Sequence, residues 1–297
     1  MLKLIKGIIK LIRCIISISV TLILIAAGIY IYARYIEPEL LMVKEEKLIT
    51  NSINLSKEPL KIVQFSDVHL GPDFTINHLR RVVERINTLE PDMIIFTGDL
   101  IEDNKVFNEK EEAAKLLGGL KATYGKFAVY GNHDHGGNGT KRYAQILKAA
   151  DFTLLVNNHQ IITLNNGERV NLIGIDDILL SKVDIAEAMK GIQETDYNIF
   201  ISHAPDVVDG VKKFPIDLQL SGHSHGGQVR IPFVGAPFTP PYGKKYVKGK
   251  YTFEDNKRII LYVNSGIGTS QMRYRFGNVP EITCFTISNE KKGKLQN

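Results

Sequence analysis

Asp, Asn and His residues follow five apolar, β-rich runs of this 297-residue chain, and these residue types can bind metals and transfer protons. They are Asp67 and His69 after 63–65, Asp99 after 94–96, Asn132 and His133 after 129–130, His203 after 199–201, and His223 and His225 after 218–220. Strands of one sheet end side by side, and ligand sites of α/β folds lie beyond their carboxyl ends. We therefore expect these side chains to converge, although Gly131-Asn132-His133-Asp134 taken alone could be a polar turn.

The mixture of imidazole and carboxylate groups suits divalent Mn, Fe, Zn or Co. In extended backbone, residues i and i+2 point the same way, so Asp67 with His69 and His223 with His225 can each present two ligands to one centre. The candidate ligands exceed one tetrahedral shell: Asp67, His69, Asp99, Asn132, His203, His223 and His225. Two metal ions that share one carboxylate account for all of them, and such sites support in-line displacement at phosphorus. The residues predict metal-assisted phosphoester hydrolysis.

Hydrophobic periodicity supplies the elements that must position these residues. We predict strands at 60–65, 93–96, 127–130, 160–164, 170–175, 197–201, 217–220, 228–231, 258–263 and 282–287, and helices at 76–89, 109–117, 141–150, 185–189 and 207–212. Residues 232–242 contain four prolines and three aromatic residues, which predicts a structured loop or lid. Alternating βαβ units followed mainly by strands predict a layered α/β fold.

The N-terminus predicts a membrane segment. The run Cys14–Ala33 is 20 residues without a charge, which is long enough to span a bilayer as a helix. Four basic residues precede it, so the N-terminus is expected to stay cytoplasmic and the large domain to lie outside. The small residues Ala26-Ala27-Gly28 leave open a cleaved signal peptide and a secreted protein. We favour the uncleaved anchor because the apolar run continues beyond them.

Charge and composition limit the possible partners and indicate the domain boundaries. Of 37 Lys and Arg residues, four precede the apolar run, which leaves 33 against 32 Asp and Glu. This near-neutral balance disfavours nucleic acid as a partner. The two cysteines, Cys14 and Cys284, predict neither a disulfide nor a thiolate metal site. We expect a basic segment with a transmembrane helix at 1–35, a linker at 36–58 that leads into an edge strand or irregular cover, a catalytic domain at 59–290 and a basic tail at 291–297.

Five ordered blocks then carry a resemblance: Ser66-Asp67-Val68-His69, Gly98-Asp99, Gly131-Asn132-His133-Asp134, His203, and Gly222-His223-Ser224-His225. In this order they resemble the signature of the calcineurin-like metallophosphoesterases, over roughly Leu60–Ile287. The stretches 221–228 and 264–269, together with the apolar N-terminus, are most similar to the membrane-associated YkuE-like branch. The resemblance implies a four-layer α/β/β/α sandwich, preceded here by the transmembrane helix.

The resemblance also implies residue roles. One metal ion would take Asp67, His69 and His225, the other Asn132, His203 and His223, with Asp99 bridging. His133 would donate a proton to the leaving oxygen or steady the phosphate charge, and Asp134 would orient His133. Glu102 stands near the place where the family often has a second Asp, and we expect it to be an orienting acid rather than a ligand. Arg273 and Arg275 are candidates for binding the phosphate, because Arg binds phosphate bidentately.

The sequence therefore predicts a membrane-anchored, dinuclear metal-dependent phosphodiesterase or phosphatase. Its location makes lipid head groups and lipid-linked phosphates plausible substrates by analogy. A nucleotide phosphodiesterase or nuclease is the first alternative, which the near-neutral domain disfavours. A non-catalytic, metal-stabilised binding module is the second, and it would require a damaged site although every ligand position is filled.

Overall fold

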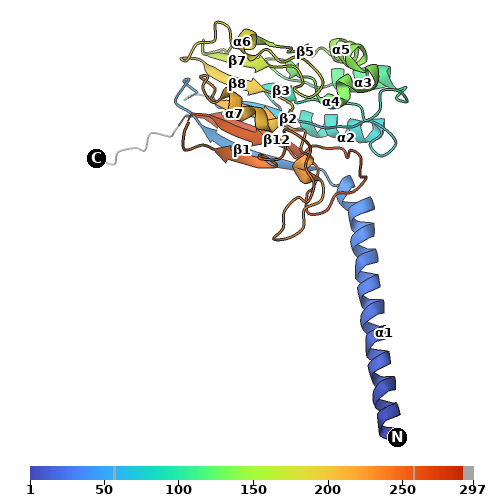
Figure 1. Cartoon of the computed structure of the whole chain (residues 1–297). Helices are drawn as coiled ribbons and strands as arrows, with labels where there is room; N and C mark the ends of the chain where they lie inside the picture. The colour runs from blue at the N-terminus through green and yellow to red at the C-terminus, as the bar shows by residue number, and fades with distance from the viewer. Residues whose placement is uncertain (56–57, 257, 290–297) are drawn as a thin grey trace.

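The structure is a computed structural model that describes residues 1–55, 58–256 and 258–289. The predicted basic tail at 291–297 lies outside these residues. A long helix, α1 (Leu2–Ile31), extends away from an α/β domain (Figure 1). It continues through a π-helical turn at Tyr32–Ile36 and a 3-10 turn at Glu37–Glu39. By length and composition α1 is a candidate membrane span or signal sequence, and none of its residues is buried by the domain.

The domain is built from short strands and helices. The strands are β1 (Met42–Ile49), β2 (Leu60–Phe65), β3 (Met93–Phe96), β4 (Lys126–Ala128), β5 (Thr153–Leu154), β6 (Asn158–Thr163), β7 (Arg169–Gly174), β8 (Tyr197–Ile201), β9 (Leu218–Ser221), β10 (Gly249–Thr252), β11 (Ile260–Val263) and β12 (Glu281–Ser288). The other helices are α2 (Ile76–Asn87), α3 (Lys110–Gly118), α4 (Asn132–His135), α5 (Thr140–Ala149), α6 (Ile185–Ala188) and α7 (Val208–Val211).

The strands form two six-stranded sheets, in the orders β1-β12-β2-β3-β4-β5 and β10-β11-β9-β8-β7-β6. In the first sheet β2, β3, β4 and β5 are parallel, and in the second β7, β8, β9 and β11 are parallel. The carboxyl ends of the parallel strands in each sheet therefore meet at one edge. This arrangement brings together the loops that carry the candidate ligands.

Three hydrophobic cores separate four layers. One core packs α2, α3 and α5 against the first sheet, and Figure 1 shows these helices gathered on one side of the domain. A second core lies between the two sheets, and a third packs α6 and α7 against the second sheet. Neighbouring residues of β2 face different cores, since Val63 contributes to the first and Ile62 to the second. The predicted α/β/β/α sandwich is confirmed.

Most predicted strands and helices match observed ones, and the differences have local causes. Residues 228–231 were predicted to be a strand, which is wrong, because they form only two isolated bridges, Val229 with Phe276 and Ile231 with Gly235. The segment predicted as a linker contains the edge strand β1, which pairs in parallel with β12 over its full length. Four consecutive charged residues in β1, at 44–47, hide the alternation that a buried strand would show. The two-residue strand β5 is too short to give a periodic signal.

Candidate active site

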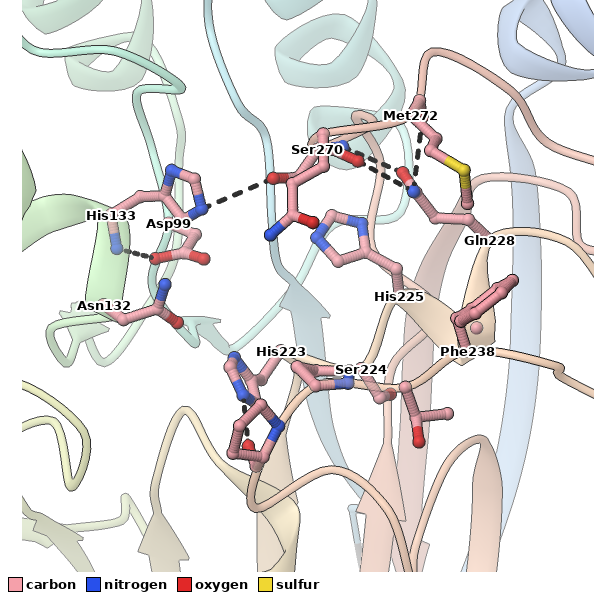
Figure 2. A pocket seen from close by; sticks show the side chains of 15 residues that line it. Asp99, Asn132, His133, His223, Ser224, His225, Gln228, Phe238, Ser270 and Met272 are labelled. Atoms are coloured by element: carbon pink, nitrogen blue, oxygen red, sulfur yellow. Dashed lines mark hydrogen bonds between the residues drawn. The ribbon is translucent and has the colours of Figure 1, made fainter.

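The candidate ligands converge beyond the carboxyl ends of β2, β3, β8 and β9 and at the first turn of α4. Figure 2 shows Asp99, Asn132, His133, His223 and His225 pointing toward a shared cavity. Residues separated by more than 150 positions in the chain are in contact there, as for His69 and His225. The convergence predicted from the strand ends is present in the fold.

One group of possible ligands consists of Asp67, His69 and His225, all buried. The Nε2 atoms of His69 and His225 are 3.0 Å apart. Oδ1 of Asp67 lies 3.3 Å from Nε2 of His225 and 3.9 Å from Nε2 of His69. These ligand atoms surround one point closely enough to bind a single cation.

A second buried group consists of Asp99, His203 and His223. Oδ2 of Asp99 lies 3.1 Å from Nε2 of His203 and 3.6 Å from Nε2 of His69. Asp99 therefore lies between the two groups, which is the position that a bridging carboxylate requires. Asn132 is near by at the start of α4, and its Oδ1 is buried without a hydrogen-bond donor among the described residues. An unsatisfied buried oxygen is costly, so this atom fits a cation ligand.

The second ring nitrogen of three histidines is held by a neighbour. Nδ1 of His203 lies 2.7 Å from the carbonyl oxygen of Thr97, and Nε2 of His223 lies 2.8 Å from that of Pro241. Nδ1 of His69 lies 2.6 Å from Oε2 of Glu102. Such contacts fix the tautomer and leave the other nitrogen available as a ligand, as is usual around metals. Both the candidate ligand atoms and the contacts that hold their rings therefore fit divalent metal ions.

The buried carboxylates make this region attractive to cations. Burial alone would lower the pKa of His203, but the carboxylates of Asp99 and Asp67 outweigh it and raise that pKa to about 10. Asp67 and Asp99 are themselves almost fully buried, with exposed fractions of 0% and 2%. Two buried like charges are unfavourable unless positive charge lies between them, which a metal ion would provide.

The ligand-bearing loops are in left-handed backbone, with positive φ at Asp67, His69, Asp99, His223 and His225. The expectation that extended backbone pairs Asp67 with His69 and His223 with His225 is therefore wrong in its mechanism. The Asp67 and His69 pair belongs to an irregular segment after β2 instead, and the His223 and His225 pair to a bend and a 3-10 turn after β9. Left-handed non-glycine residues cost of order 1–3 kcal/mol each and cluster at functional sites. The fold sustains this strain where the ligands must face inward.

Two glycines allow the ligand loops to approach each other. A Cβ atom on Gly131 would lie 2.2 Å from Oδ1 of Asp99, and one on Gly222 would lie 2.3 Å from Oδ2 of Asp67. Both distances are far below van der Waals contact. Any side chain at either position would therefore displace a candidate ligand.

His133 faces the cavity from the first turn of α4. Its Nδ1 lies 3.0 Å from the carbonyl oxygen of Glu102, and its Nε2 lies 3.3 Å from Oγ of Ser270 (Figure 2). Burial lowers the pKa of His133, but the carboxylate of Asp99 and the contacts with Glu102 outweigh it and raise the pKa above its usual value. The position and charge of the ring suit a proton donor or a cationic partner of phosphate.

Asp134 has a different role from the one predicted. Its carboxylate accepts hydrogen bonds from the main-chain N–H groups of Gly131, Asp99 and Leu100, at 2.8, 2.8 and 2.9 Å. The ring of His133 is instead positioned by Glu102 and Ser270. Asp134 thus ties the loop after β3 to the start of α4, and it positions Asp99 through the backbone rather than orienting the imidazole.

The two candidate phosphate-binding arginines lie in different surroundings, and only the prediction for Arg275 is contradicted. Arg275 is fully buried, and its guanidinium donates to the carbonyl oxygens of Ser265, Gly268 and Asn278, so its prediction as a substrate residue is wrong. Arg273 lies partly exposed with its Nε 2.6 Å from Oδ2 of Asp73, beside a smaller cavity of about 110 Å³. Arg275 fastens the loop before β12 and has no donor directed to a phosphate.

The main cavity has a volume of about 370 Å³. Its walls include residues that the motifs did not predict: Gln228, Phe238, Thr239, Pro240, Pro241, Ser270, Gln271 and Met272. Three sequence signals pointed near these residues: Gln228 ends the 221–228 stretch, Ser270 directly follows the Asn264–Thr269 stretch, and residues 232–242 predicted a loop or lid. The cavity wall is therefore built from two loops that lack metal ligands, one of them rich in proline.

Comparison with known proteins agrees with this geometry. The sequence model of the family described as Calcineurin-like phosphoesterase matches residues 60–227. The uncharacterized metallophosphoesterase YkuE of Bacillus subtilis is 39% identical, over 90% of this chain and 92% of the relative. The UDP-2,3-diacylglucosamine pyrophosphatase LpxG of Chlamydia muridarum is 30% identical, over 90% and 95%. The phosphodiesterase YaeI of Escherichia coli is 28% identical, over 86% and 92%.

Proposed function

The chain belongs to the calcineurin-like phosphoesterase family of hydrolases acting on ester bonds, and we propose that it is a dinuclear phosphodiesterase or phosphatase anchored to a membrane. The observation that carries the proposal is the position of Asp99 between two buried ligand groups, 3.1 Å from His203 and 3.6 Å from His69. A carboxylate in this position can bind two neighbouring cations at once, as two-metal phosphoesterase sites require.

We assign the proposed ligands to two metal ions according to the two buried groups of side chains in the structure. Asp67, His69 and His225 would hold one ion, and His203, His223 and Asn132 the other, with Asp99 shared. The ligand set suits Mn, Fe, Zn or Co. When bound, two such ions would activate water near neutral pH and neutralise charge on the phosphoryl oxygens.

The residues around the ions would complete the reaction. His133 would protonate the leaving oxygen or stabilise the charge of the phosphate, since its ring faces the cavity beside Asp99. The carbonyl oxygen of Glu102 accepts from Nδ1 of His133 and so directs Nε2 toward Ser270 and the cavity. Hydrogen bonds from three main-chain N–H groups to Asp134 would hold the bridging residue in place.

We further propose that the substrate is a lipid head group or a lipid-linked phosphate. Two observations support this: α1 is apolar enough to cross a membrane, and the relative LpxG is named for a diacylated sugar nucleotide. Four basic residues before the apolar run favour a cytoplasmic N-terminus with the catalytic domain outside. Cleavage of α1 as a signal peptide would release the same domain as a secreted enzyme.

The reaction class is tested with the purified full-length protein and added Mn²⁺. Hydrolysis of bis-p-nitrophenyl phosphate, compared with p-nitrophenyl phosphate, would distinguish a diesterase from a monoesterase. We expect metal-dependent hydrolysis of at least one. The absence of activity on both, with two ions bound per chain, would contradict this proposal and favour a metal-stabilised binding module.

A second assay concerns the substrate class. Phospholipids and lipid-linked diphosphates in detergent micelles would be compared with nucleic acids and dinucleotides at equal phosphate concentration. Preference for the lipids is expected. Preference for the nucleotides would support the alternative of a nucleotide phosphodiesterase or nuclease.

A further inference from the structure

We propose that the loop 231–238 inserts into the outer part of the same bilayer that α1 crosses, as a second membrane contact of the domain. The inference rests on the proposed anchoring by α1. It assigns a partner, the lipid bilayer, to an apolar surface defined by Ile231, Phe233, Val234 and Phe238. This surface is called the apolar tip below.

The apolar tip is an ordered projection. The main chains of Ile231 and Gly235 exchange two hydrogen bonds of 2.9 Å, which close a tight hairpin with Phe233 and Val234 at its turn. Phe233 has a φ of 66° and an exposed fraction of 109%, and Val234 is 71% exposed. A phenylalanine in left-handed backbone that buries nothing within the domain does not serve the fold. Such exposed apolar groups indicate a contact outside the chain.

The apolar tip begins beside the end of α1. Val229 pairs with Phe276, and the N–H of Arg230 donates to the carbonyl oxygen of Phe276 at 2.7 Å. The ring of Phe276 in turn lies 6.2 Å from that of Tyr32, directly after α1. Figure 1 shows the orange loop of this region extending from the domain on the side from which α1 leaves. Both features therefore point toward one membrane surface.

The domain is joined rigidly to α1. The main-chain N–H of Arg275 donates to the carbonyl oxygen of Ala33 at 2.9 Å, and Ala33 is buried. Glu37 is 1% exposed, and its carboxylate accepts from the N–H groups of Gly277 and Asn278. Since the residues that follow the apolar helix are already part of the domain, the orientation of the domain toward the bilayer is fixed.

Aromatic residues indicate the level of the bilayer surface. Tyr30 and Tyr35 are 51% and 59% exposed at the domain end of α1, and tyrosine concentrates at membrane interfaces. The ring of Tyr30 also lies 5.8 Å from that of Tyr274, so this interface residue touches the domain. The adjoining face of the domain, which includes the apolar tip, thus lies at the head groups.

This placement has a consequence for the active site. Phe238 belongs to the apolar tip and also lines the main cavity, together with Pro240 and Pro241. The carbonyl oxygen of Pro241 contacts Nε2 of His223, a proposed ligand, at 2.8 Å. A bilayer contact at the tip would therefore place the cavity entrance at the membrane surface, where a head group can reach the ligands while its acyl chains stay in the lipid.

Tryptophan fluorescence tests the inference, because the natural chain contains no Trp. The full-length Phe233→Trp variant is reconstituted in nanodiscs of phosphatidylethanolamine and phosphatidylglycerol, with or without bromine on the acyl chains. We expect brominated lipid to remove at least about half of the emission, since an inserted Trp lies within reach of the bromine atoms. Val234→Trp serves as a second reporter on the same turn.

Leu180→Trp is the matched control. Leu180 is 59% exposed shortly before α6, and Figure 1 shows α6 on the side of the domain away from α1. Its emission should fall by less than about a tenth, because it lies in water. If both tip reporters are as insensitive to brominated lipid as the control, the inference is overturned.

The experiment separates this inference from the proposals beneath it. If the reconstituted protein floats with lipid but its tip reporters are not quenched, the proposed anchoring by α1 is supported and the proposed contact of the apolar tip with the bilayer is refuted. Protein that does not float with lipid would contradict both. Hydrolysis of soluble bis-p-nitrophenyl phosphate, measured on the same samples, reports on the catalytic proposal, and quenching at the tip is expected whatever its outcome.

Discussion

Nδ1 of His69 lies 2.6 Å from Oε2 of Glu102, and the same oxygen lies 3.6 Å from Nδ1 of His133. One acid thus stands behind a proposed metal ligand and beside the proposed proton donor. Burial would raise the pKa of Glu102, but its contact with His69 outweighs this and lowers the pKa below its usual value. The carboxylate is therefore ionised at neutral pH and can increase the basicity of His69 as a ligand.

Replacing Glu102 with Gln should weaken binding of one metal ion by about 10–100-fold, because loss of such a supporting carboxylate has that effect. Metal titration by calorimetry measures the affinity, and activity at saturating metal should recover to a large extent. Glu111→Gln is the matched control, since Glu111 lies on α3 with a side chain that is 78% exposed. Equal affinities in the two variants would show that Glu102 does not support a ligand.

The substitution His133→Ala should lower turnover by about 10²–10⁴-fold, the usual contribution of a general acid. Metal content should stay unchanged, because His133 is not among the proposed ligands. Steady-state kinetics and metal analysis of one preparation measure both quantities. Loss of a metal ion together with turnover would instead identify His133 as a ligand.

The close approach at Gly222 predicts that Gly222→Ala abolishes most activity. Its Cβ would lie 1.9 Å from Oγ of Ser66 and 2.3 Å from Oδ2 of Asp67, so the Asp67 carboxylate must move. Gly210→Ala on α7 is the control, because a Cβ there meets no other described atom within 4 Å. The control should leave activity unchanged and stabilise the fold by up to about 1 kcal/mol, as helical Gly→Ala changes do. Comparable activity of both variants would refute the tight packing at Gly222.

Replacing Arg275 should lower the thermal stability of the domain much more than replacing Arg273. Arg275→Met should destabilise the domain by about 3 kcal/mol or more, because buried carbonyl oxygens of Ser265, Gly268 and Asn278 lose their donor. Arg273→Met should cost less than about 1 kcal/mol, since it removes a partly exposed ion pair with Asp73. Unfolding midpoints that are lowered equally would contradict this distinction.

The convergence of the site could be predicted from the sequence because its signals are local. An apolar run followed by Asp or His marks a strand end, and parallel strands bring such ends together, as for Asp67 after β2 and His203 after β8. The same reasoning failed for backbone conformation. The segments that follow β2 and β9 have positive φ at Asp67 and His223, which the hydrophobic periodicity of the sequence does not predict.

The roles of polar residues away from the motifs could not be predicted for a related reason. Whether Arg275 faces a phosphate or main-chain carbonyl groups depends on the packing of the loop before β12, which sequence spacing does not specify. Asp134 follows His133 directly, yet the cap of a short helix turns its carboxylate toward Gly131, Asp99 and Leu100. His133 and Asp134 are adjacent in the chain, but their side chains contact different groups, so adjacency did not predict their contacts.

The proposal that two ions share Asp99 is tested most directly by Asp99→Asn. The amide oxygen can still accept the hydrogen bond that Oδ1 of Asp99 takes from the N–H of His133, at 2.8 Å, so the fold should persist. Metal analysis by mass spectrometry, with hydrolysis of bis-p-nitrophenyl phosphate, should show one ion lost per chain and activity lowered about 10³-fold or more. Full activity with both ions retained would contradict the account.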